Sequence, residues 1–287
     1  MKSKTLLIFI ITLLTPSLFS RESHAIVDPS ETPNNIFGIH IIDENDLPDA
    51  AALVNSSGGE WGYVTLVIRE DERSVERWQG VFNKMRRLKL IPVIRIATKF
   101  ENGVWIKPKE DEIESWVSFL SSLNWVVKNR YVILFNEPNH AKEWGAEISP
   151  GAYAKAARIY ASRLKESSND FFVLPAGFDA AADGSNGTMR VEAFWKAMAD
   201  EDKEIFEIFD GWTSHSYPNP DFSGIRSFSW EVTHLGKYGL ESDIPIFITE
   251  TGWIRNGKNS ADEIARNFEK AFKEVWNSDE RVVAVTP

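Results

Sequence analysis

The feature that most restricts the fold of this sequence is a regular alternation of short apolar runs with segments of helical period. Eight runs are rich in β-branched and aromatic residues, and most are apolar on both faces, as expected for strands covered on both sides. They are Ile36–Ile41, Gly62–Ile68, Ile91–Ile96, Tyr131–Phe135, Phe171–Leu174, Gly211–Ser214, Ile244–Thr249 and Val282–Val285. Eight strands separated by helices predict the α/β class and a (β/α)8 TIM barrel.

Helix signals fall between these runs. Apolar residues recur three or four positions apart in Ser74–Leu90, Glu110–Lys128, Ser149–Lys165 and Ser260–Trp276, with a weaker pattern over residues 224–237. Ser149 followed by proline is typical of a helix start, and Ser260 with Glu263 predicts a capping box.

A doubly wound open sheet is the competing architecture. It is disfavoured because Gly38–Asp46, which includes the end of the first strand, contains no glycine-rich phosphate turn. The sequence ends at Pro287, where a barrel would continue with the loop and helix after its eighth strand. Either the sequence is a fragment, or the barrel closes imperfectly and lacks its final helix.

The first 25 residues have the layout of a secretory signal. Lys2 and Lys4 precede an apolar stretch from Leu6 to Phe19, and Ser23-His24-Ala25 provides small residues for a cleavage site. The apolar stretch is short and interrupted for a membrane-spanning helix. We therefore expect residues 1–25 to be a signal peptide and residues 26–287 to form one domain that is secreted, either periplasmic or extracellular.

Composition excludes several kinds of chemistry and partner. Without cysteine there is no disulfide framework, thiolate zinc site or cysteine nucleophile. The 32 basic and 42 acidic residues give a net charge of −10, which argues against a nucleic-acid partner. No segment of the mature chain is long and apolar enough for stable membrane insertion, and we expect a monomer.

Two glutamates follow apolar strands at positions where barrel enzymes carry their chemistry. Glu137 follows the fourth predicted strand and Glu250 follows the seventh, on roughly opposite sides of an eight-stranded ring. A buried, unpaired charge at such a position costs several kcal/mol. Paired carboxylates predict cleavage of a glycosidic bond, in which one is a protonated acid and the other is ionised. A separation of about 5–5.5 Å gives retention, whereas about 6.5–9.5 Å gives inversion.

The residues around these glutamates resemble the motifs of a known group of enzymes. The three motifs are Phe135-Asn136-Glu137-Pro138-Asn139, Ser214-His215-Ser216-Tyr217-Pro218 and Ile248-Thr249-Glu250-Thr251-Gly252-Trp253. Together, in this order and spacing, they resemble the retaining (β/α)8 glycoside hydrolases of the clan that includes the cellulase and mannanase family five. The resemblance implies Glu137 as acid/base, Glu250 as nucleophile, and a β-linked oligo- or polysaccharide as substrate, with no cofactor.

The same resemblance implies roles for four neighbouring residues. Asn136 would hydrogen-bond the sugar 2-hydroxyl, Tyr217 would hold the nucleophile, and His215 would line the same subsite. Arg95, at the end of the third strand, would lie beneath the nucleophile and depress its pKa. Arg69 also ends a strand, so the two arginines are interchangeable at this point.

Tryptophans are candidates for stacking on sugar rings. Trp105, Trp144 and Trp253 fall in predicted loops after strands, where aromatic faces can contact the apolar C–H surfaces of a sugar, although loop packing is the alternative. Among these we expect Trp144 and Trp253 to bind substrate. The related enzymes commonly place a further tryptophan after the eighth strand, and this sequence ends before such a residue.

Three other hypotheses stay open from the sequence. The glutamates also fit structural ion pairs with Arg95, or a catalytically degenerate barrel that only binds glycans. A metal-dependent hydrolase would use His40, Glu137, His215 and Glu250, but no His-x-His follows the first strand and the sequence has five histidines. Cellulose, mannan, xylan and β-1,3-glucan are not distinguished, because subsite loops decide between them.

Overall fold

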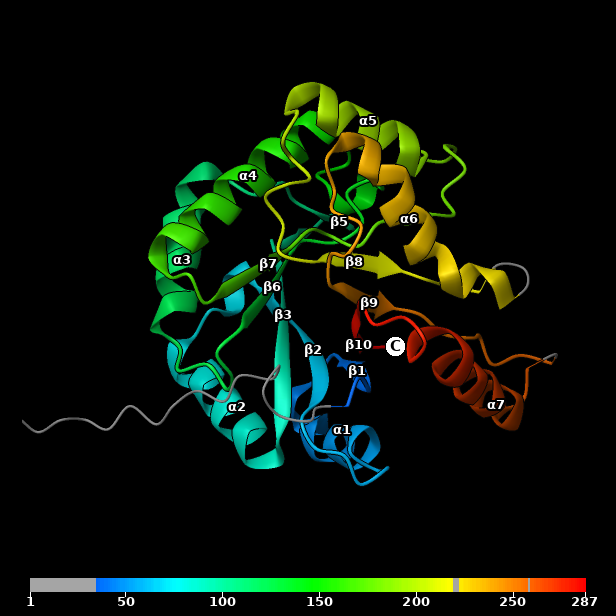
Figure 1. The fold of residues 1–287 in the computed structure, drawn as a ribbon. Helices are drawn as coiled ribbons and strands as arrows, with labels where there is room; N and C mark the ends of the chain where they lie inside the picture. The colour runs from blue at the N-terminus through cyan, green and yellow to red at the C-terminus, as the bar shows by residue number, and fades with distance from the viewer. Residues whose placement is uncertain (1–34, 219–221, 258) are drawn as a thin grey trace, which may run out of the picture.

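Eight parallel strands lie at the centre of the structure, and helices surround them (Figure 1). The computed structural model describes residues 35–218, 222–257 and 259–287, so the predicted signal peptide lies outside the described residues. All eight predicted strands are present. They are β1 (Gly38–Ile41), β2 (Gly62–Arg69), β3 (Leu90–Ala97), β6 (Arg130–Leu134), β7 (Phe171–Leu174), β8 (Trp212–His215), β9 (Ile246–Glu250) and β10 (Val282–Val285).

The strands form two sheets in which neighbours in the chain are neighbours in space. One sheet has five strands in the order β1-β2-β3-β6-β7, and the other has three in the order β10-β9-β8. Every ladder between these strands is parallel. The expected α/β barrel is therefore confirmed, and its parallel strands direct their carboxyl ends to one mouth.

Two seams join the sheets into a ring. At the seam between β1 and β10, a parallel bridge pairs Phe37 with Val285, and the His40 amide donates to the Pro287 carbonyl at 2.9 Å. At the seam between β7 and β8, the Asp210 amide donates to the Val173 carbonyl at 3.0 Å. In the described part of the chain, the ring thus closes through isolated contacts rather than through continuous ladders at these two positions.

Aromatic side chains pack between the two sheets. The ring of Tyr131 on β6 contacts Phe172 on β7 and Phe247 on β9, with centroid separations of 5.1 and 5.2 Å. Phe172 and Phe247 are themselves 5.9 Å apart. Because Phe247 belongs to the smaller sheet and the other two rings to the larger, this aromatic contact supplements the sparse hydrogen bonds of the seams.

Seven α-helices are described, and they lie outside the strands (Figure 1). They are α1 (Leu47–Val54), α2 (Val75–Leu88), α3 (Ile113–Ser122), α4 (Pro150–Ser167), α5 (Val191–Glu201), α6 (Ser227–Leu235) and α7 (Ala261–Ala271), which continues in a π-helical turn, Phe272–Trp276. Short 3-10 turns occur at Glu44–Asp46, Glu70–Glu72, Glu110–Glu112, Ala141–Glu143, Phe222–Arg226 and Gly236–Tyr238. The sequence pattern did not predict α1 and α5.

The helix ends agree with the predicted signals in part. The capping box at α7 is confirmed, since the Ser260 hydroxyl accepts from the Glu263 amide and the Glu263 carboxylate accepts from the Ser260 amide. Ser149 precedes Pro150 at the start of α4, but its side chain makes no capping hydrogen bond. The predicted helix Glu110–Lys128 was too long. The helix α3 ends at Ser122, because the backbone at Leu123 adopts an extended conformation.

A short antiparallel hairpin follows β3 and was not predicted. It pairs β4 (Phe100–Glu101) with β5 (Val104–Trp105). The Gly145 amide donates to the Trp105 carbonyl at 2.7 Å, and the Thr98 hydroxyl donates to the Ile106 carbonyl at 2.6 Å. The first bond fixes the hairpin against the loop that follows β6, and the second joins the two segments that flank the hairpin.

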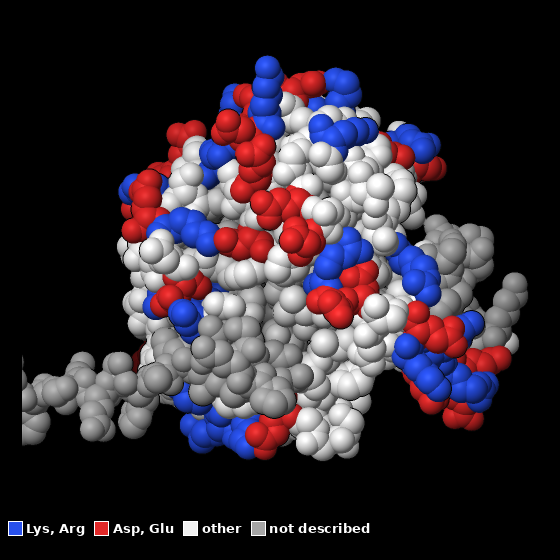
Figure 2. All heavy atoms as spheres, viewed as in Figure 1, with Lys and Arg blue, Asp and Glu red and all other residues white. Residues whose placement is uncertain are grey.

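Figure 2 shows acidic and basic side chains interspersed on the visible face, without the continuous basic patch that a polyanion requires. Among the described residues, no helix combines the length and apolarity needed to cross a bilayer.

Candidate active site

The two predicted glutamates come together at the mouth of the barrel. One carboxylate oxygen of Glu137, one of Glu250 and one ring nitrogen of His215 all lie within 4.8 Å of one another. His215 Nδ1 is 2.9 Å from Glu137 Oε1 and 3.7 Å from Glu250 Oε2. The imidazole is buried, and both carboxylates are largely shielded from solvent. The structure therefore assembles three predicted site residues from two different sheets.

Glu250 accepts hydrogen bonds from two side chains, one on a strand and one in a loop. Arg95 Nη1 donates to its Oε1 at 2.8 Å, and the Tyr217 hydroxyl donates to its Oε2 at 3.1 Å. Burial alone would raise the pKa of Glu250, but the charges of His215 and Arg95 and the arginine hydrogen bond outweigh it and hold the pKa below its usual value. Glu250 is therefore ionised at neutral pH, as a nucleophile must be.

The ambiguity between the two arginines is resolved by the structure. Arg69 forms a two-pronged ion pair with Asp71, with contacts of 3.0 and 2.8 Å. Arg95 instead contacts both Glu250 and Asn136. Arg95 is therefore the arginine that contacts Glu250 and, together with His215, lowers its pKa.

His215 lies in a space that exists because residue 177 is glycine. Burial would lower the pKa of His215, but the charge of Glu250 and the hydrogen bond to Glu137 raise it above its usual value. A Cβ atom at Gly177 would come 2.1 Å from His215 Nε2, far inside van der Waals contact. The Gly177 carbonyl also accepts the Glu137 amide at 2.9 Å. Gly177 thus adjoins both partners of the His215–Glu137 contact.

We expect Gly177→Ala to destabilise the fold by about 1–3 kcal/mol through overpacking, and to lower activity by displacing His215. The matched control is Gly80→Ala in the interior of α2, where nothing lies within 4 Å of the new Cβ. That change should stabilise the protein by roughly 0.5–1 kcal/mol. Urea denaturation of both variants measures the effects, and a shift of the same sign in both would contradict the prediction.

Strained backbone surrounds Asn136. Phe135 and Glu137 have φ values of 72° and 31°, in the left-handed region that non-glycine residues rarely adopt, at about 1–3 kcal/mol each. The Phe135 ring is held edge-on by Trp144 and Tyr160, with centroid separations of 5.5 and 5.4 Å. This packing offsets the strain and fixes the direction of the motif at the end of β6.

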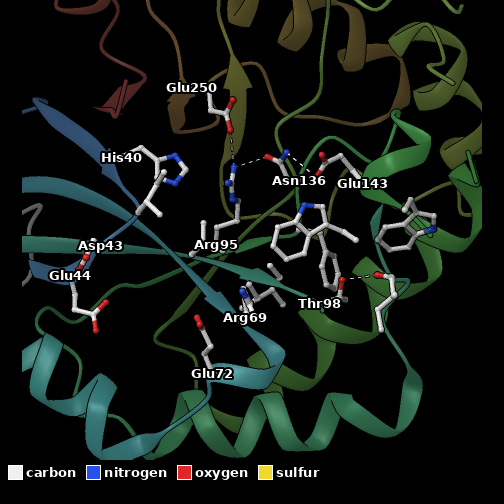
Figure 3. A pocket seen from close by; sticks show the side chains of 18 of the residues that line it. His40, Asp43, Glu44, Arg69, Glu72, Arg95, Thr98, Asn136, Glu143 and Glu250 are labelled. Atoms are coloured by element: carbon white, nitrogen blue, oxygen red, sulfur yellow. Dashed lines mark hydrogen bonds and ion pairs between the residues drawn. The ribbon is translucent and has the colours of Figure 1, made fainter. Parts of the chain in front are cut away.

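Asn136 is the middle member of a hydrogen-bonded row along one wall. Its Oδ1 accepts from Arg95 Nη1 at 2.6 Å, and its Nδ2 donates to Glu143 Oε2 at 3.4 Å. Figure 3 shows the row from Glu250 through Arg95 and Asn136 to Glu143. Its two ends are carboxylates, so the donor edge of the Asn136 amide faces Glu143 and the acceptor edge faces Arg95.

The row borders a cavity of about 980 Å³ at the mouth. Figure 3 also shows His40, Asp43, Glu44, Arg69 and Glu72 around this cavity. The pKa of His40 is lowered to about 4 by burial and by the charge of Arg95, so His40 is a neutral wall residue at physiological pH. The volume is at the upper end of the range that small-molecule sites occupy, roughly 300–1,000 Å³.

The three candidate tryptophans differ in placement. Trp105 and Trp144 line the cavity, although Trp144 is buried and packs on Phe135. The Trp253 ring packs edge-on against Phe268 at 4.9 Å and is not among the residues that line this cavity. The structure thus brings Trp105, rather than Trp253, to the site.

Glu143 is a cavity residue that the sequence did not single out. It ends the 3-10 turn after β6, and burial raises its pKa above the usual value. Glu143 comes six residues after Glu137, and an irregular loop separates the two. No helical or strand periodicity in the sequence therefore links them. Only the folded loop shows that both belong to one site.

Glu137, His215 and Glu250 are also the described residues grouped closely enough to hold a metal ion. Their surroundings fit an ion-pair network better. His215 Nδ1 contacts Glu137 at 2.9 Å, and the Arg95 guanidinium already contacts Glu250 at 2.8 Å. A metal cation bound here would be repelled by the positive charge of Arg95. It would also compete with a proton for His215, whose pKa is raised.

Together, the parallel barrel and the facing carboxylates define a class: an α/β-barrel catalytic core that acts from the carboxyl ends of its strands. Residues 97–285 match the family described as "Glycosyl hydrolase catalytic core". The chain belongs to this family, and the expected membership among barrel glycoside hydrolases is confirmed. No protein among curated sequences matches it significantly.

Several solved structures with similar folds are glycoside hydrolases. A monomeric β-xylosidase from Caulobacter crescentus CB15 has a TM-score of 0.63 and 15% identity, over 91% of this chain and 60% of that one. A mannanase catalytic domain from Streptomyces sp. SirexAA-E has a TM-score of 0.52 and 14% identity, over 91% and 81%. A GH128 endo-β-1,3-glucanase from Pseudomonas viridiflava has a TM-score of 0.54 and 14% identity, over 88% and 86%. This chain spans about 60% of the length of the β-xylosidase.

Proposed function

We propose that this protein is a secreted, retaining glycoside hydrolase that cleaves β-linked glycans by double displacement. The observation that carries the proposal is the proximity of Glu137 and Glu250, since one carboxylate oxygen of each lies within 4.8 Å of the other. An inverting enzyme needs about 6.5–9.5 Å between its carboxyl groups to admit water, whereas a retaining enzyme needs about 5–5.5 Å. The spacing favours retention.

In the first step, ionised Glu250 attacks the anomeric carbon while protonated Glu137 gives its proton to the leaving glycosidic oxygen. The bond between that carbon and oxygen breaks, an alcohol leaves, and the sugar becomes esterified to Glu250. Arg95 and Tyr217 contact the two oxygens of Glu250 and fix its orientation for this attack.

In the second step, ionised Glu137 takes a proton from water, and the water oxygen attacks the anomeric carbon and releases Glu250. Two inversions leave the β configuration unchanged. The charge of Glu250 is one of the groups that raise the pKa of His215, and that charge is absent in the ester. The pKa of His215 should therefore be lower in the intermediate than in the free enzyme.

Loss of Arg95 should change the pH dependence of activity. In Arg95→Leu the pKa of Glu250 rises, because one of the charges that lower it is removed. We expect the acidic limb of the kcat/KM profile to move to higher pH, and the maximum to fall about ten- to a hundredfold. Arg163→Leu on the exposed face of α4 is the control. An unmoved acidic limb in Arg95→Leu would contradict the role of this arginine.

A mechanism-based inhibitor tests the proposal directly. Residues 26–287 are incubated with dinitrophenyl 2-deoxy-2-fluoro-β-glycosides of xylose, mannose and glucose, and the intact mass is measured. The fluorine slows both steps and the good leaving group restores the first, so an ester should accumulate. The expected result is a mass gain of one fluorosugar that maps to Glu250. If unmodified β-glycans bind without hydrolysis or adduct, the protein is a binding barrel instead.

The sugars in this panel follow from the folds that resemble this one. Those proteins are a β-xylosidase, a mannanase and an endo-β-1,3-glucanase, which makes β-linked xylose, mannose and glucose the first choices. Cellulose-derived oligosaccharides complete the set. No cofactor is added, because double displacement by two carboxylates needs none.

Export is part of the proposal and rests on the layout of residues 1–25. Expression of the full sequence in a bacterium with a secretory pathway should release a protein whose first residue is Ile26. Mass spectrometry of the periplasmic and extracellular fractions checks this. A cytoplasmic product that retains Met1 to Ala25 would refute export without touching the catalytic proposal.

A further inference from the structure

The cavity wall continues past the catalytic pair to an acidic and aromatic region. The row of side chains passes from Glu250 through Arg95 and Asn136 to Glu143, as Figure 3 shows. Two residues later, the Gly145 amide is bonded to the Trp105 carbonyl at 2.7 Å. One continuous surface therefore links the nucleophile to the β4–β5 hairpin.

Glu143 retains hydrogen-bonding capacity toward the cavity. Its side chain is 11% exposed, and the ammonium group of Lys142, itself 64% exposed, is 3.9 Å away, beyond hydrogen-bond distance. Arg95 directs its Nη1 to Glu250 and Asn136. The Glu143 carboxylate is thus shielded, its ion pair with Lys142 is loose, and its hydrogen bond from Asn136 is long, at 3.4 Å. A carboxylate in this setting is stabilised by additional hydrogen-bond donors.

Trp105 gives the same region a fixed apolar face. It lines the cavity, and its backbone is anchored by the bond from Gly145 and by the pairing of β5 with β4. The Phe100 ring packs against it at 5.2 Å with an interplanar angle of 61°. The indole is thus held in place before a ligand arrives, which reduces the entropy lost on binding.

We propose that Glu143 and Trp105 form a second sugar-binding subsite, which takes a neutral pyranose of an oligosaccharide beside the sugar at Glu250. The proposal rests on the proposed function. Hydroxyl groups donate to the carboxylate, and the apolar face of the ring packs on the indole.

The charges around the cavity favour a neutral sugar over a uronic acid. A sugar carboxylate beside Glu143 would place two like charges in a poorly hydrated site. Other arginines of the wall are already paired, Arg69 with Asp71 and Arg77 with Glu44, each at 2.8 Å. The cavity of about 980 Å³ also has room for more than one sugar.

The experiment compares a substrate that needs one sugar subsite with substrates that need several. Kinetics are measured for a dinitrophenyl β-monoside and for unmodified oligosaccharides of the same sugar, two to six residues long. The variants are Trp105→Ala, Glu143→Ala and Glu143→Gln. Trp230→Ala, an exposed tryptophan on α6, is the matched control.

We expect Trp105→Ala and Glu143→Ala to lower kcat/KM for the oligosaccharides about tenfold or more beyond any loss on the monoside, which reports the effect of Glu143 on the row through Asn136. Glu143→Gln, which keeps one acceptor oxygen, should recover part of the loss and should improve the relative rate on an oligosaccharide with a uronic acid. Equal losses of kcat/KM on the monoside and the oligosaccharides, or no loss on either, would rule out the proposed subsite. Failure of the unaltered protein on every substrate would overturn the proposed function and the subsite with it.

Discussion

Glu250→Gln is expected to lower kcat by about 10⁴-fold or more, because an amide cannot form the covalent intermediate. The change preserves the shape of the side chain and removes its charge, so the fold should persist. Initial rates on a dinitrophenyl β-glycoside measure the loss, and circular dichroism confirms the fold. The fluorosugar adduct should be absent in this variant.

Two controls make the result specific to Glu250. Glu147→Gln changes an exposed glutamate that pairs with Lys107, and its activity should match that of the unaltered protein. In Glu250→Gly, added azide can attack the anomeric carbon directly and should give the α-glycosyl azide. A β-azide product, or substantial activity in Glu250→Gln, would show that another residue forms the ester.

Glu137→Ala is expected to cost about 10²–10⁴-fold on substrates whose leaving group needs a proton. A dinitrophenolate leaves without assistance, so formation of the ester from that substrate should change little. The ester then persists, because no general base activates water. A burst of dinitrophenolate followed by a slow steady rate, in stopped-flow absorbance, is the expected signature.

Azide separates the role of Glu137 from that of Glu250. In Glu137→Ala the nucleophile is intact, and azide opens the ester from the free face to give the β-glycosyl azide. The two variants should therefore give azides of opposite configuration, which proton NMR distinguishes. The same configuration from both variants would refute the assigned pair of roles.

The strands and the motifs of the candidate site were predictable because their signals are local. An apolar run such as Tyr131–Phe135 is buried on both faces whichever neighbours cover it. The motif residues Glu137 and Glu250 stand at the ends of such runs, and a parallel barrel brings all strand ends to one mouth. Their placement follows from topology, and the structure brings them together.

Other parts of the site depend on contacts between distant segments. Gly177 is one glycine among 17 in the sequence, and only the position of His215 shows why a side chain is excluded there. Glu143 reaches the cavity through an irregular loop. Trp105 and Trp253 both come after strands of the barrel. The Trp253 ring packs edge-on against Phe268, whereas the β4–β5 hairpin presents Trp105 to the cavity.

The division of the barrel into two sheets has a consequence for assembly. Glu137 follows β6 of the five-stranded sheet, whereas His215 and Glu250 lie in the three-stranded one, and isolated hydrogen bonds and packed aromatic rings join the two sheets. A chain divided in the exposed loop at residues 183–187 would therefore yield two pieces, each with one carboxylate of the pair. Neither piece holds a complete centre, so turnover by the mixture would report their reassociation, as in a split reporter.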